Sequence, residues 1–492
     1  MTKPGISKIA EISPEQSIVL ITGNETLPDN LLLSAMEKDF AEGKLKAKPD
    51  HVFINSYNRC VYIVPIRKCA NHYKVREEVR RSAYRMRKLI KANNHKELVI
   101  TSDDAYPGVL EDFAEGLILS VYSFSKYKTK KEEAERSMYP ASLLFHGNAG
   151  DASVQWLNEL TDAVWFTRDL INEPVNHLNA ATLANEVRST GDKAGFCVEI
   201  LTKGKIEALK MGGILAVNKG SVDPPVFCIL EWKPEGHLNE SPIVLVGKGI
   251  VYDTGGLNIK TGESMAGMKG DMAGAAIVNG VFHTIAKTKL PLHVIGLLPM
   301  TDNRPGGNAY AQGDIITMHN KLTVEIGNTD AEGRLVMADA ISYASKYKPE
   351  IIIDIATLTG SAAMTFGDQA VAVMTNAERK YIDLLAEAGT DTYERIAELP
   401  FWEEYGELLK SEVADMRNVG GGREAGAITA GKFLERFAEF PLIHLDIAGT
   451  DLLKKDDYYK LKSSPATGLR LLAEFLRKLH LHMQKKAAVN DN

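Results

Sequence analysis

The chain has 492 residues, 45% of them hydrophobic and 25% charged, and its formal net charge is −6. A chain of this length has material for two or more domains with a large core, and its composition is that of an ordinary globular protein. The weak negative charge gives no overall reason to expect nucleic acid or an acidic membrane as a partner.

Four cysteines in so long a chain fit a reducing compartment, and none of them forms the C-x-x-C pair of a zinc knuckle or a thioredoxin-like site. The N-terminal segment lacks the apolar core of a signal peptide. No apolar run reaches the length that spans a bilayer. We therefore expect a cytoplasmic protein without a membrane partner.

The first 150 residues predict a small α/β domain. Short apolar or β-branched runs alternate there with segments whose apolar residues recur at helical spacing. Such alternation favours a mostly parallel sheet. The predicted strands are 17–22, 51–54, 61–66, 98–101 and 143–145, and the predicted helices are 74–92 and 108–124.

Residues 151–172 carry apolar positions at helical spacing and predict a long helix. The helix should end before Pro174, because the residue that precedes a proline is driven out of the helical conformation. We interpret 151–174 as a linker helix between a first domain, 1–150, and a second domain, 175–492.

Beyond the linker the apolar runs become longer and uninterrupted, as in parallel strands that are buried on both faces. In open α/β sheets, ligand sites lie beyond the carboxyl ends of the strands. The chemistry is therefore expected in the residues just after these runs, which are 243–246, 292–298, 351–355 and 442–445.

Three segments at such positions set acidic residues in an apolar, glycine-rich context. Carboxylates are rarely buried without a compensating charge, and divalent metal ions suit carboxylate oxygens. Each aspartate taken alone is as well explained by a helix N-cap or a turn, but the combination favours a metal site. The segments are 247–260, 268–276 and 328–335, and their acids are Asp253, Asp271, Asp330 and Glu332.

Other catalytic motifs are absent or incomplete. The chain has no H-E-x-x-H and no G-x-S-x-G, which argues against a thermolysin-like site and an ordinary serine hydrolase. Residues 426–433 nearly match a phosphate-binding loop, but Phe433 stands where a serine or threonine should hold magnesium. Nucleotide binding at this segment is therefore not expected.

The segment 328–335, which reads Asn-Thr-Asp-Ala-Glu-Gly-Arg-Leu, resembles the signature of the leucyl aminopeptidases, the M17 metallopeptidases. The resemblance extends over most of the second half and fades in the first 150 residues. It implies a macro-like first domain and a larger catalytic α/β domain with a mixed, mostly parallel central sheet. Further matching segments are 168–178, 211–221, 308–314, 357–361 and 444–449.

The resemblance implies a metal-dependent aminopeptidase that releases N-terminal, leucine-like residues from peptides with a free N-terminus. Two divalent ions, Mn²⁺ or Zn²⁺, would activate a shared water, with Lys248 as a neutral amine ligand whose pKa is lowered by burial and by the adjacent cation. Lys260 would stabilise the developing negative charge, and Arg334 would hold bicarbonate as a proton shuttle. The implied metal ligands are Lys248, Asp253, Asp271, Asp330 and Glu332.

The same resemblance implies an apolar pocket for the first side chain of the substrate. Asp451 follows this set closely and would shift the preference if it reached the rim of the pocket. The turns at 302–307 and 311–314 depart from the family's usual sequence, which puts their local shape in doubt without touching a proposed ligand. The implied substrate-binding residues are Met268, Asn328, Thr357, Gly360 and Ala448.

Three further hypotheses concern partners. The resemblance implies a homohexamer, built as a dimer of trimers. The basic stretch 67–96 is explained by a solvated helical face, with DNA binding as the alternative. A macro-like first domain suggests ADP-ribose binding as a hypothesis. Because 1–150 contain no phosphate-cradling glycine loop, a scaffold role in assembly is the preferred interpretation.

Overall fold

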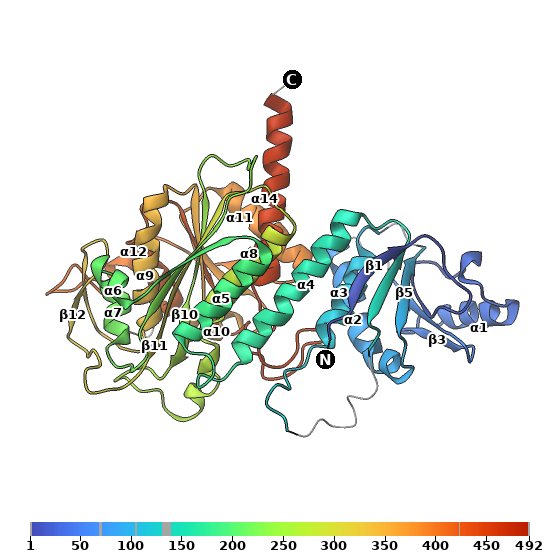
Figure 1. Cartoon of the computed structure of the whole chain (residues 1–492), viewed down its shortest axis with the longest axis horizontal. Helices are drawn as coiled ribbons and strands as arrows, with labels where there is room; N and C mark the ends of the chain where they lie inside the picture. Colours follow the sequence, from blue (N-terminus) through green and yellow to red (C-terminus); the bar gives the residue numbers. More distant parts are fainter. Residues whose placement is uncertain (1, 68–70, 104–105, 130–138, 423, 491–492) are drawn as a thin grey trace. The chain divides into compact units, whose positions relative to one another are not determined.

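The computed structural model describes residues 2–67, 71–103, 106–129, 139–422 and 424–490 (Figure 1). By its internal contacts the chain divides into two units. Unit 1 comprises Met1–Trp165 and Lys455–Leu461, and unit 2 comprises Phe166–Lys454 and Lys462–Asn492. The division falls inside helix α4, Asp151–Asn172, which ends at the residue that the sequence predicts. The proposed domain boundaries around the linker stay a prediction.

Unit 1 contains a six-stranded sheet in the order β1-β6-β5-β2-β4-β3. All neighbouring strands are parallel except the edge strand β3, which runs antiparallel to β4. The strands are β1 Gly5–Ile9, β2 Ile18–Thr22, β3 Val52–Asn55, β4 Cys60–Pro65, β5 Glu97–Ser102 and β6 Ser142–His146.

Helices cover both faces of this sheet. One core packs the sheet against α2 and α3, and a second core on the other face packs it against α1. The helices are α1 Ala35–Leu45, α2 His72–Ala92 and α3 Val109–Ser120, with a 3-10 turn at Asp29–Leu31. Because alternate side chains of a strand point to opposite faces, the fully buried runs of β2 and β4 supply both cores.

A short segment from late in the chain belongs to unit 1. In Lys455–Leu461 the Tyr459 hydroxyl donates to the Glu77 carboxylate at 2.8 Å, and the Arg81 guanidinium lies over the Tyr458 ring, 4.6 Å from its centre. Both Glu77 and Arg81 lie on α2. No local pattern in the sequence predicts this long-range contact.

Unit 2 is built on a nine-stranded sheet in the order β16-β15-β18-β14-β9-β11-β8-β7, with β10 paired to β11. A separate sheet of three strands has the order β12-β13-β17. The strands are β7 Cys197–Leu201, β8 Val226–Trp232, β9 Ile243–Gly247, β10 Gly249–Asp253, β11 Val294–Asn303, β12 Ile315–Thr317, β13 Thr323–Glu325, β14 Ile351–Ala356, β15 Val371–Thr375, β16 Ile396–Glu398, β17 Met416–Arg417 and β18 Leu442–Asp446.

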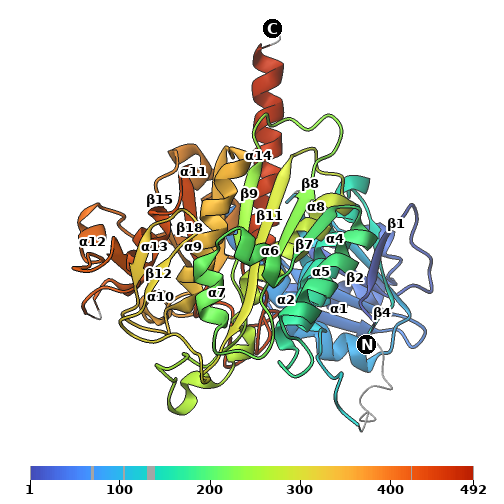
Figure 2. The same cartoon turned by 60° about the vertical axis from the view of Figure 1, so that its left-hand side comes forward.

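The large sheet is also covered on both faces, with α7, α9 and α13 on one side and α5, α8, α11 and α14 on the other (Figure 2). Its central pairs among β9, β11, β14 and β18 are parallel, and the outer pairs of β8 and of β15 with β18 are antiparallel. The helices are α5 Ala180–Ala194, α6 Lys203–Ala208, α7 Gly212–Asn218, α8 Ala273–Lys287, α9 Glu332–Ala344, α10 Gly360–Phe366, α11 Arg379–Thr392, α12 Glu404–Glu407, α13 Gly426–Glu435 and α14 Leu469–Asn490.

The predicted fold class is confirmed, since both units are α/β with mixed, mostly parallel sheets. The helix predicted over 108–124 is shorter than expected and ends at Ser120. The sequence patterns missed β1 and α1, because a short edge strand and a polar surface helix carry little apolar periodicity. No helix among the described residues is long and apolar enough to cross a membrane.

Candidate metal centre

One lysine lies among carboxylates at the carboxyl end of β9. Lys248 follows Gly247, the last residue of that strand, and its Nζ lies 2.7 Å from Asp271 Oδ2 and 3.0 Å from Glu332 Oε1. Asp271 follows a 3-10 turn, and Glu332 opens α9. The Thr357 hydroxyl, just beyond β14, donates to Asp271 Oδ1 at 2.7 Å and fixes that carboxylate.

A second lysine lies beside the remaining acids. Lys260 Nζ lies 2.9 Å from Asp253 Oδ2 and 2.5 Å from Asp330 Oδ1. Asp253 is the last residue of β10, and its Oδ1 accepts a hydrogen bond from the Gly255 amide at 2.8 Å. The structure thus brings together all five predicted metal ligands and Lys260, from three separate segments of the chain.

Two glycines make room for these side chains. A Cβ at Gly333 would lie 2.4 Å from Lys248 Cε and 2.7 Å from its Nζ. Gly255 has φ +86°, which favours glycine, and a Cβ there would lie 2.9 Å from Asp330 Oδ1. The glycines in the three predicted segments therefore allow the backbone to approach the charged groups closely.

The site is buried and carries an excess of negative charge. Lys248, Asp253, Asp271 and Glu332 are each at most 5% exposed, and Asp330 is half-buried. Four carboxyl groups face two lysines, so full ionisation of the acids leaves two negative charges that the nearby lysines do not neutralise. Burial, together with the neighbouring Asp253 carboxylate, raises the pKa of both Asp271 and Glu332.

The protonation of Lys248 differs from the expectation drawn from burial. Burial alone lowers the pKa of this lysine, but the Asp271, Glu332 and Asp253 carboxylates outweigh burial and hold the pKa above its ordinary value. The protein's own groups therefore favour the ammonium form. A metal ion that binds this nitrogen must displace its proton.

The donor set fits divalent cations. Oxygens of Asp253, Asp330 and Glu332 lie within 4.8 Å of one another, close enough to surround one ion. Carboxylate oxygens suit Mn²⁺, Mg²⁺ and Zn²⁺, and such cations compensate the excess negative charge of the site. The buried acids and the adjacent amine of Lys248 provide further donors beside this cluster.

Asn303 was missed by the sequence analysis. This last residue of β11 is fully buried, and its Nδ2 donates to Asp253 Oδ1 at 2.9 Å and to the Thr329 carbonyl at 3.0 Å, with Glu332 Oε2 at 3.5 Å. Groups of this kind orient metal ligands. The signal that could have found it is its position at the end of a long buried strand, inside a turn that departs from the family's sequence.

Arg334 is the third residue of α9, within its first turn, and is 7% exposed. Its NH1 donates to the Asn418 carbonyl at 2.6 Å. Asn418 also ties down the loop before α9, because its Nδ2 donates to the Asn328 carbonyl at 2.7 Å. Asn328 in turn accepts the Asp330 amide through its side chain at 2.8 Å, so it shapes the loop that presents Asp330.

The predicted pocket residues lie around the same edge of the sheet. Met268 is half-buried and opens the turn that precedes Asp271, and Gly360 is exposed at the start of α10. The Asp446 carboxylate links the remaining two segments, because its Oδ1 accepts the Leu358 amide at 3.0 Å and the Ala448 amide at 3.1 Å. Leu358 directly follows Thr357.

Asp451 does not face the rim of this pocket. It is 3% exposed, and its Oδ1 accepts a hydrogen bond from the Ser464 hydroxyl at 2.8 Å. Its neighbour Leu452 instead lies against the turn before Met268, since a Cβ at Gly267 would lie 2.5 Å from Leu452 Cδ2. Leu452 is 44% exposed and is the better candidate to extend the apolar wall.

The near match to a phosphate-binding loop proves to be part of a helix. Gly426–Glu435 form α13, and Lys432 lies in its interior, 2% exposed. Its Nζ pairs with Glu435 at 2.7 Å and Glu403 at 3.0 Å. The lysine that a nucleotide would need is therefore engaged by acids.

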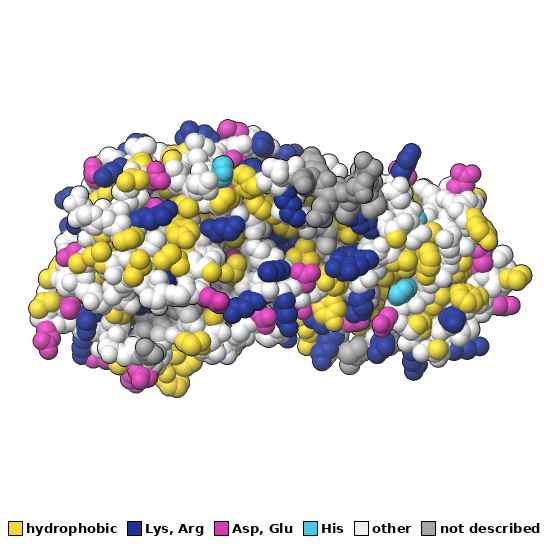
Figure 3. All heavy atoms as spheres, turned by 90° about the horizontal axis from the view of Figure 1, so that it is seen from below, with side chains coloured by type: hydrophobic (Ala, Val, Ile, Leu, Met, Phe, Trp, Pro, Cys, Tyr) yellow, Lys and Arg dark blue, Asp and Glu magenta, His cyan; other side chains and the backbone are white. Residues whose placement is uncertain are grey.

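Helix α2 lies wholly within the basic stretch 67–96, of which 68–70 are outside the described residues. Several of its arginines pair with acids of the same unit. Arg80 lies 2.5 Å from both Asp112 and Glu115, and Arg85 pairs with Glu78. On the face drawn in Figure 3, Lys and Arg side chains are interspersed with hydrophobic, Asp and Glu side chains. The Arg80 pairs are buried, so only the exposed part of the stretch, such as Arg85 with Glu78, fits the reading of a solvated helical face.

An α/β fold that gathers four acids and two lysines at the carboxyl ends of its central strands defines a metal-dependent hydrolase. Comparison with known proteins specifies the class. Residues 165–473 match the family model for the catalytic domain of the cytosol aminopeptidases, peptidase family M17. The chain belongs to the cytosol aminopeptidase family, as the segment 328–335 predicts, and is a metal-dependent aminopeptidase.

Individual relatives agree with this assignment. The chain is 42% identical over 399 residues to a probable cytosol aminopeptidase of Chloroherpeton thalassium, covering 78% of each chain. It is 43% identical over 375 residues to one of Geobacter sulfurreducens, covering 75% of each. The solved structure of the bottromycin maturation enzyme BotP in complex with Mn matches with a TM-score of 0.81 and 26% identity, covering 94% of this chain and 99% of that one.

Proposed function

We propose that this aminopeptidase uses two divalent ions, Mn²⁺ or Zn²⁺, held by the five clustered side chains. Lys248, Asp253, Asp271 and Glu332 would hold one ion. Asp253, Asp330 and Glu332 would hold the other, with help from the Asp330 carbonyl. The observation that carries the proposal is the buried cluster of four carboxylates with two uncompensated charges. The Mn complex of the similar enzyme BotP supports a divalent cofactor.

Two such ions would supply a water of lowered pKa and polarise the scissile carbonyl. The chain's own contribution is positioning and charge. Lys260, whose pKa the Asp253 and Asp330 carboxylates hold above its usual value despite burial, stays an ammonium at neutral pH. It can donate hydrogen bonds to the oxygen on which negative charge develops, and a donor of this kind contributes about 10²–10³ in rate.

Arg334 is the proposed holder of bicarbonate. Its guanidinium is anchored at one end by the Asn418 carbonyl, which leaves a planar fork fixed in a buried position close to Glu332. Such a fork suits a planar oxyanion, which could accept and return a proton during turnover. The test is a bicarbonate dependence of the rate that Arg334→Lys loses while its metal content stays that of the native protein.

Substrate preference follows from the pocket edge. Met268 and the exposed Leu452 offer apolar surface, and Gly360 leaves space where a side chain would stand. We propose a preference for leucine-like first residues on peptides with a free N-terminus. The metal centre would recognise the free amine, which explains removal of one residue at a time.

The direct test measures release of leucine from an unblocked leucyl amide and from its N-acetylated counterpart. Metal content per chain is counted on the same sample by elemental analysis. The expected result is hydrolysis of the unblocked amide alone, loss of activity with a chelator, recovery with Mn²⁺ or Zn²⁺, and two ions per chain. One ion per chain at full activity would contradict the two-metal proposal, and equal hydrolysis of both amides would contradict recognition of the amine.

We further propose a cytoplasmic homohexamer, arranged as a dimer of trimers, with 1–150 as an N-terminal domain, 151–174 as the linker and 175–492 as the catalytic domain. The family match over 165–473 supports the placing of the catalytic domain, and the names of the relatives support a cytosolic location. The hexamer rests on the family resemblance alone. Light scattering of the purified chain gives the mass directly. A monomer or dimer at micromolar concentration would contradict the hexamer.

A further inference from the structure

A row of charged side chains lies buried on one face of the large sheet of unit 2. Asp354 on β14 is the register partner of His444 on the neighbouring strand β18, and Asp446 lies two residues further along β18. Because side chains two apart on a strand share a face, His444 and Asp446 point to the same side of the sheet. All three are 0% exposed, and His444 Nδ1 lies 2.6 Å from Asp354 Oδ1.

Opposite charges alternate along this row. Burial lowers the pKa of His444, but the Asp354 and Asp446 carboxylates outweigh burial and hold that pKa above its ordinary value. Burial lowers the pKa of Arg334 to about 10, against the Glu332 and Asp446 carboxylates, which favour its charged form. Asp446 therefore interacts with one cationic side chain on its own strand and with another on α9.

Stability alone does not account for a buried row of this kind. The rest of the two strands is apolar, since β14 reads Ile-Ile-Ile-Asp-Ile-Ala and β18 reads Leu-Ile-His-Leu-Asp. Replacing buried charged groups by well-packed apolar residues is often neutral or stabilising, because taking charges out of water is costly. The row ends at Asp446, the last residue of β18, at the edge of the sheet where the metal centre lies.

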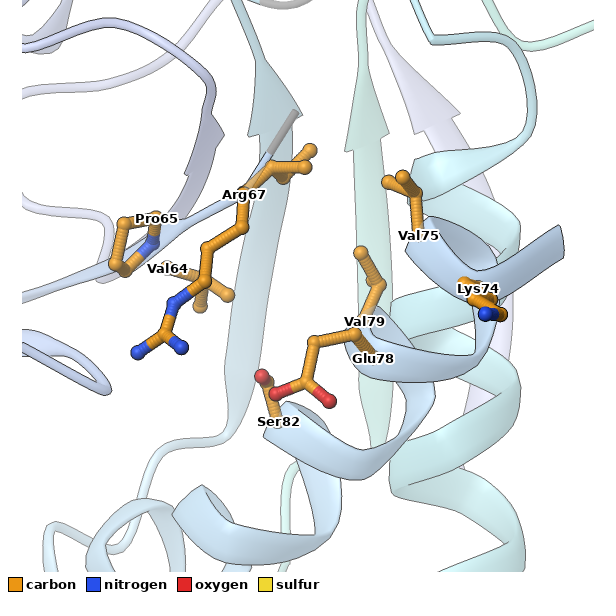
Figure 4. Close-up of a pocket in the computed structure, with 9 residues that line it drawn as sticks. Val64, Pro65, Arg67, Lys74, Val75, Glu78, Val79 and Ser82 are labelled. Atoms are coloured by element: carbon orange, nitrogen blue, oxygen red, sulfur yellow. The ribbon is translucent and has the colours of Figure 1, made fainter. Parts of the chain in front are cut away.

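The charged groups beyond the strands of unit 1 differ, because they are exposed. Figure 4 shows a pocket of about 260 Å³ between the end of β4 and α2. Its charged side chains Arg67, Lys74 and Glu78 are exposed, and its floor is apolar and includes Val64 and Val75. Exposed charges keep their hydration, so they do not carry the cost that the buried row carries.

The Asp446 carboxylate fixes two turns of the chain. Its Oδ1 accepts hydrogen bonds from the Leu358 amide at 3.0 Å and the Ala448 amide at 3.1 Å. Its Oδ2 accepts a hydrogen bond from the Thr359 hydroxyl at 2.7 Å. The Thr359 hydroxyl oxygen in turn accepts the Ala362 amide at 3.1 Å and caps α10. The turn after β14 is therefore held at two successive residues.

Thr357, the residue just before this anchored pair, contacts two of the proposed metal ligands. Its hydroxyl donates to Asp271 Oδ1 at 2.7 Å, and its carbonyl accepts a hydrogen bond from Lys248 Nζ at 3.2 Å. Both ligands are proposed to hold the same ion. A shift of the turn would therefore move two donors of that ion together.

We propose that Asp446 is a positioning residue of the metal centre, which acts through Thr357 on the orientation of Lys248 and Asp271. His444 and Arg334 compensate its charge, so the buried row serves to keep a carboxylate at the end of β18. Groups that orient metal ligands typically change metal affinity about 10–100-fold. The inference rests on the proposed function, since it takes Lys248 and Asp271 as ligands.

Equilibrium dialysis of the full Mn²⁺-loaded chain tests the proposal. The chain is dialysed against a series of buffered Mn²⁺ concentrations, and the Mn²⁺ retained per chain is counted by elemental analysis. In Asp446→Asn the amide can still accept from the two backbone amides, but it loses the charge and cannot accept from the Thr359 hydroxyl. We expect the Mn²⁺ concentration for half loading to rise about tenfold or more.

A second pair of variants keeps the test decisive if Asp446→Asn folds poorly. Thr359→Val removes the hydroxyl that donates to Asp446 and changes no charge, so it should weaken Mn²⁺ binding in the same direction. Thr359→Ser keeps that hydroxyl and should retain the native affinity.

Asp339→Asn is the matched control for a purely structural effect. Asp339 of α9 is equally buried, and its carboxylate accepts the Ile214 and His319 amides at 3.0 Å each. We expect this variant to lower the Tm and to keep the native Mn²⁺ affinity. Native affinity in both Asp446→Asn and Thr359→Val would overturn the inference, as would an equal loss of affinity in Asp339→Asn. Absence of Mn²⁺ binding by the native chain would overturn the proposed function as well.

Discussion

Both units expose the carboxyl ends of parallel strands, and the two edges carry opposite electrostatics. In unit 2 the edge gathers buried acids that outnumber the lysines beside them. In unit 1 the corresponding edge carries exposed cations above an apolar floor. The same architecture therefore presents opposite charge at its carboxyl edge in the two units, and the side chains rather than the fold set the electrostatics there.

The largest effect is expected from loss of Asp253, which we propose as a ligand shared by both ions. Asp253→Asn keeps the shape of the side chain and removes its charge. We expect kcat/KM for a leucyl amide to fall by about a thousandfold or more, since a catalytic metal contributes several kcal/mol. Glu263→Gln, an exposed acid in the same glycine-rich region, is the matched control and should retain native kinetics. Retention of more than a tenth of the activity by Asp253→Asn would falsify its role as a ligand.

Lys260 tests whether the ammonium group beside Asp253 and Asp330 contributes to the rate of the reaction. Lys260→Met keeps the length of the side chain and removes the ammonium that contacts Asp253 and Asp330. In the proposed mechanism this ammonium stabilises charge that develops in the transition state, so we expect kcat to fall about 10²–10³-fold with a smaller change in KM. Metal content must be measured on the same sample. A loss of metal that accounts for the whole effect would assign Lys260 to the assembly of the site instead.

Asn303 tests whether metal binding in unit 2 depends on a side chain that hydrogen-bonds a proposed ligand without being a ligand itself. Asn303→Ala removes the donor to Asp253 and leaves the acids in place. We expect the Mn²⁺ concentration for half-maximal activity to rise about 10–100-fold. Asn308→Ala, an exposed asparagine in the following turn, is the control. An unchanged Mn²⁺ dependence in Asn303→Ala would show that Asp253 keeps its orientation without this hydrogen bond.

A buried acid of unit 2 outside the metal cluster is expected to affect stability and not activity. Burial raises the pKa of Asp451 to about 8, with Ser464, Glu394 and Arg168 as its polar neighbours. An unfolded aspartate titrates near about 3.9, so the folded chain holds this proton more tightly. Native stability should therefore fall as pH rises from about 4 to about 8, by at most about 1.4 kcal/mol per pH unit from this group.

Asp451→Asn cannot ionise and should remove that slope. Thermal unfolding should be measured at pH 5 and at pH 9. The Tm of the variant, relative to that of the native chain, should be higher at pH 9 than at pH 5. The comparison with Asp314→Asn, an exposed acid, accounts for the general effect of losing one charge. Parallel pH profiles of the native and Asp451→Asn chains would mean that Asp451 is ionised in the folded protein.

Local sequence patterns predicted the central strands of unit 2 and the long helix α4, but not where the strands end. The apolar runs at 351–355 and 442–445 became the central strands β14 and β18, because strands buried on both faces need uninterrupted apolar sequence. The helix over 151–172 appeared with the predicted end. The run at 292–298 proved to be only the first part of β11, whose polar end residues Asp302 and Asn303 are buried by contacts that the local sequence does not reveal.

The sequence alone determined the family, the α/β class and the set of acids, because the signature at 328–335 and the glycine-rich segments are local strings whose chemistry can be read directly. Tertiary structure alone decided which charges meet. Lys248 reaches Asp271 and Glu332 across 23 and 84 positions in the chain, and Asn303 reaches Asp253 across 50. In the folded chain Asp451 is hydrogen-bonded to Ser464, and Lys455–Leu461 belong to unit 1. The physical reason is that long-range packing of side chains depends on where each segment lies in the folded sheet, and a local pattern carries no record of that position.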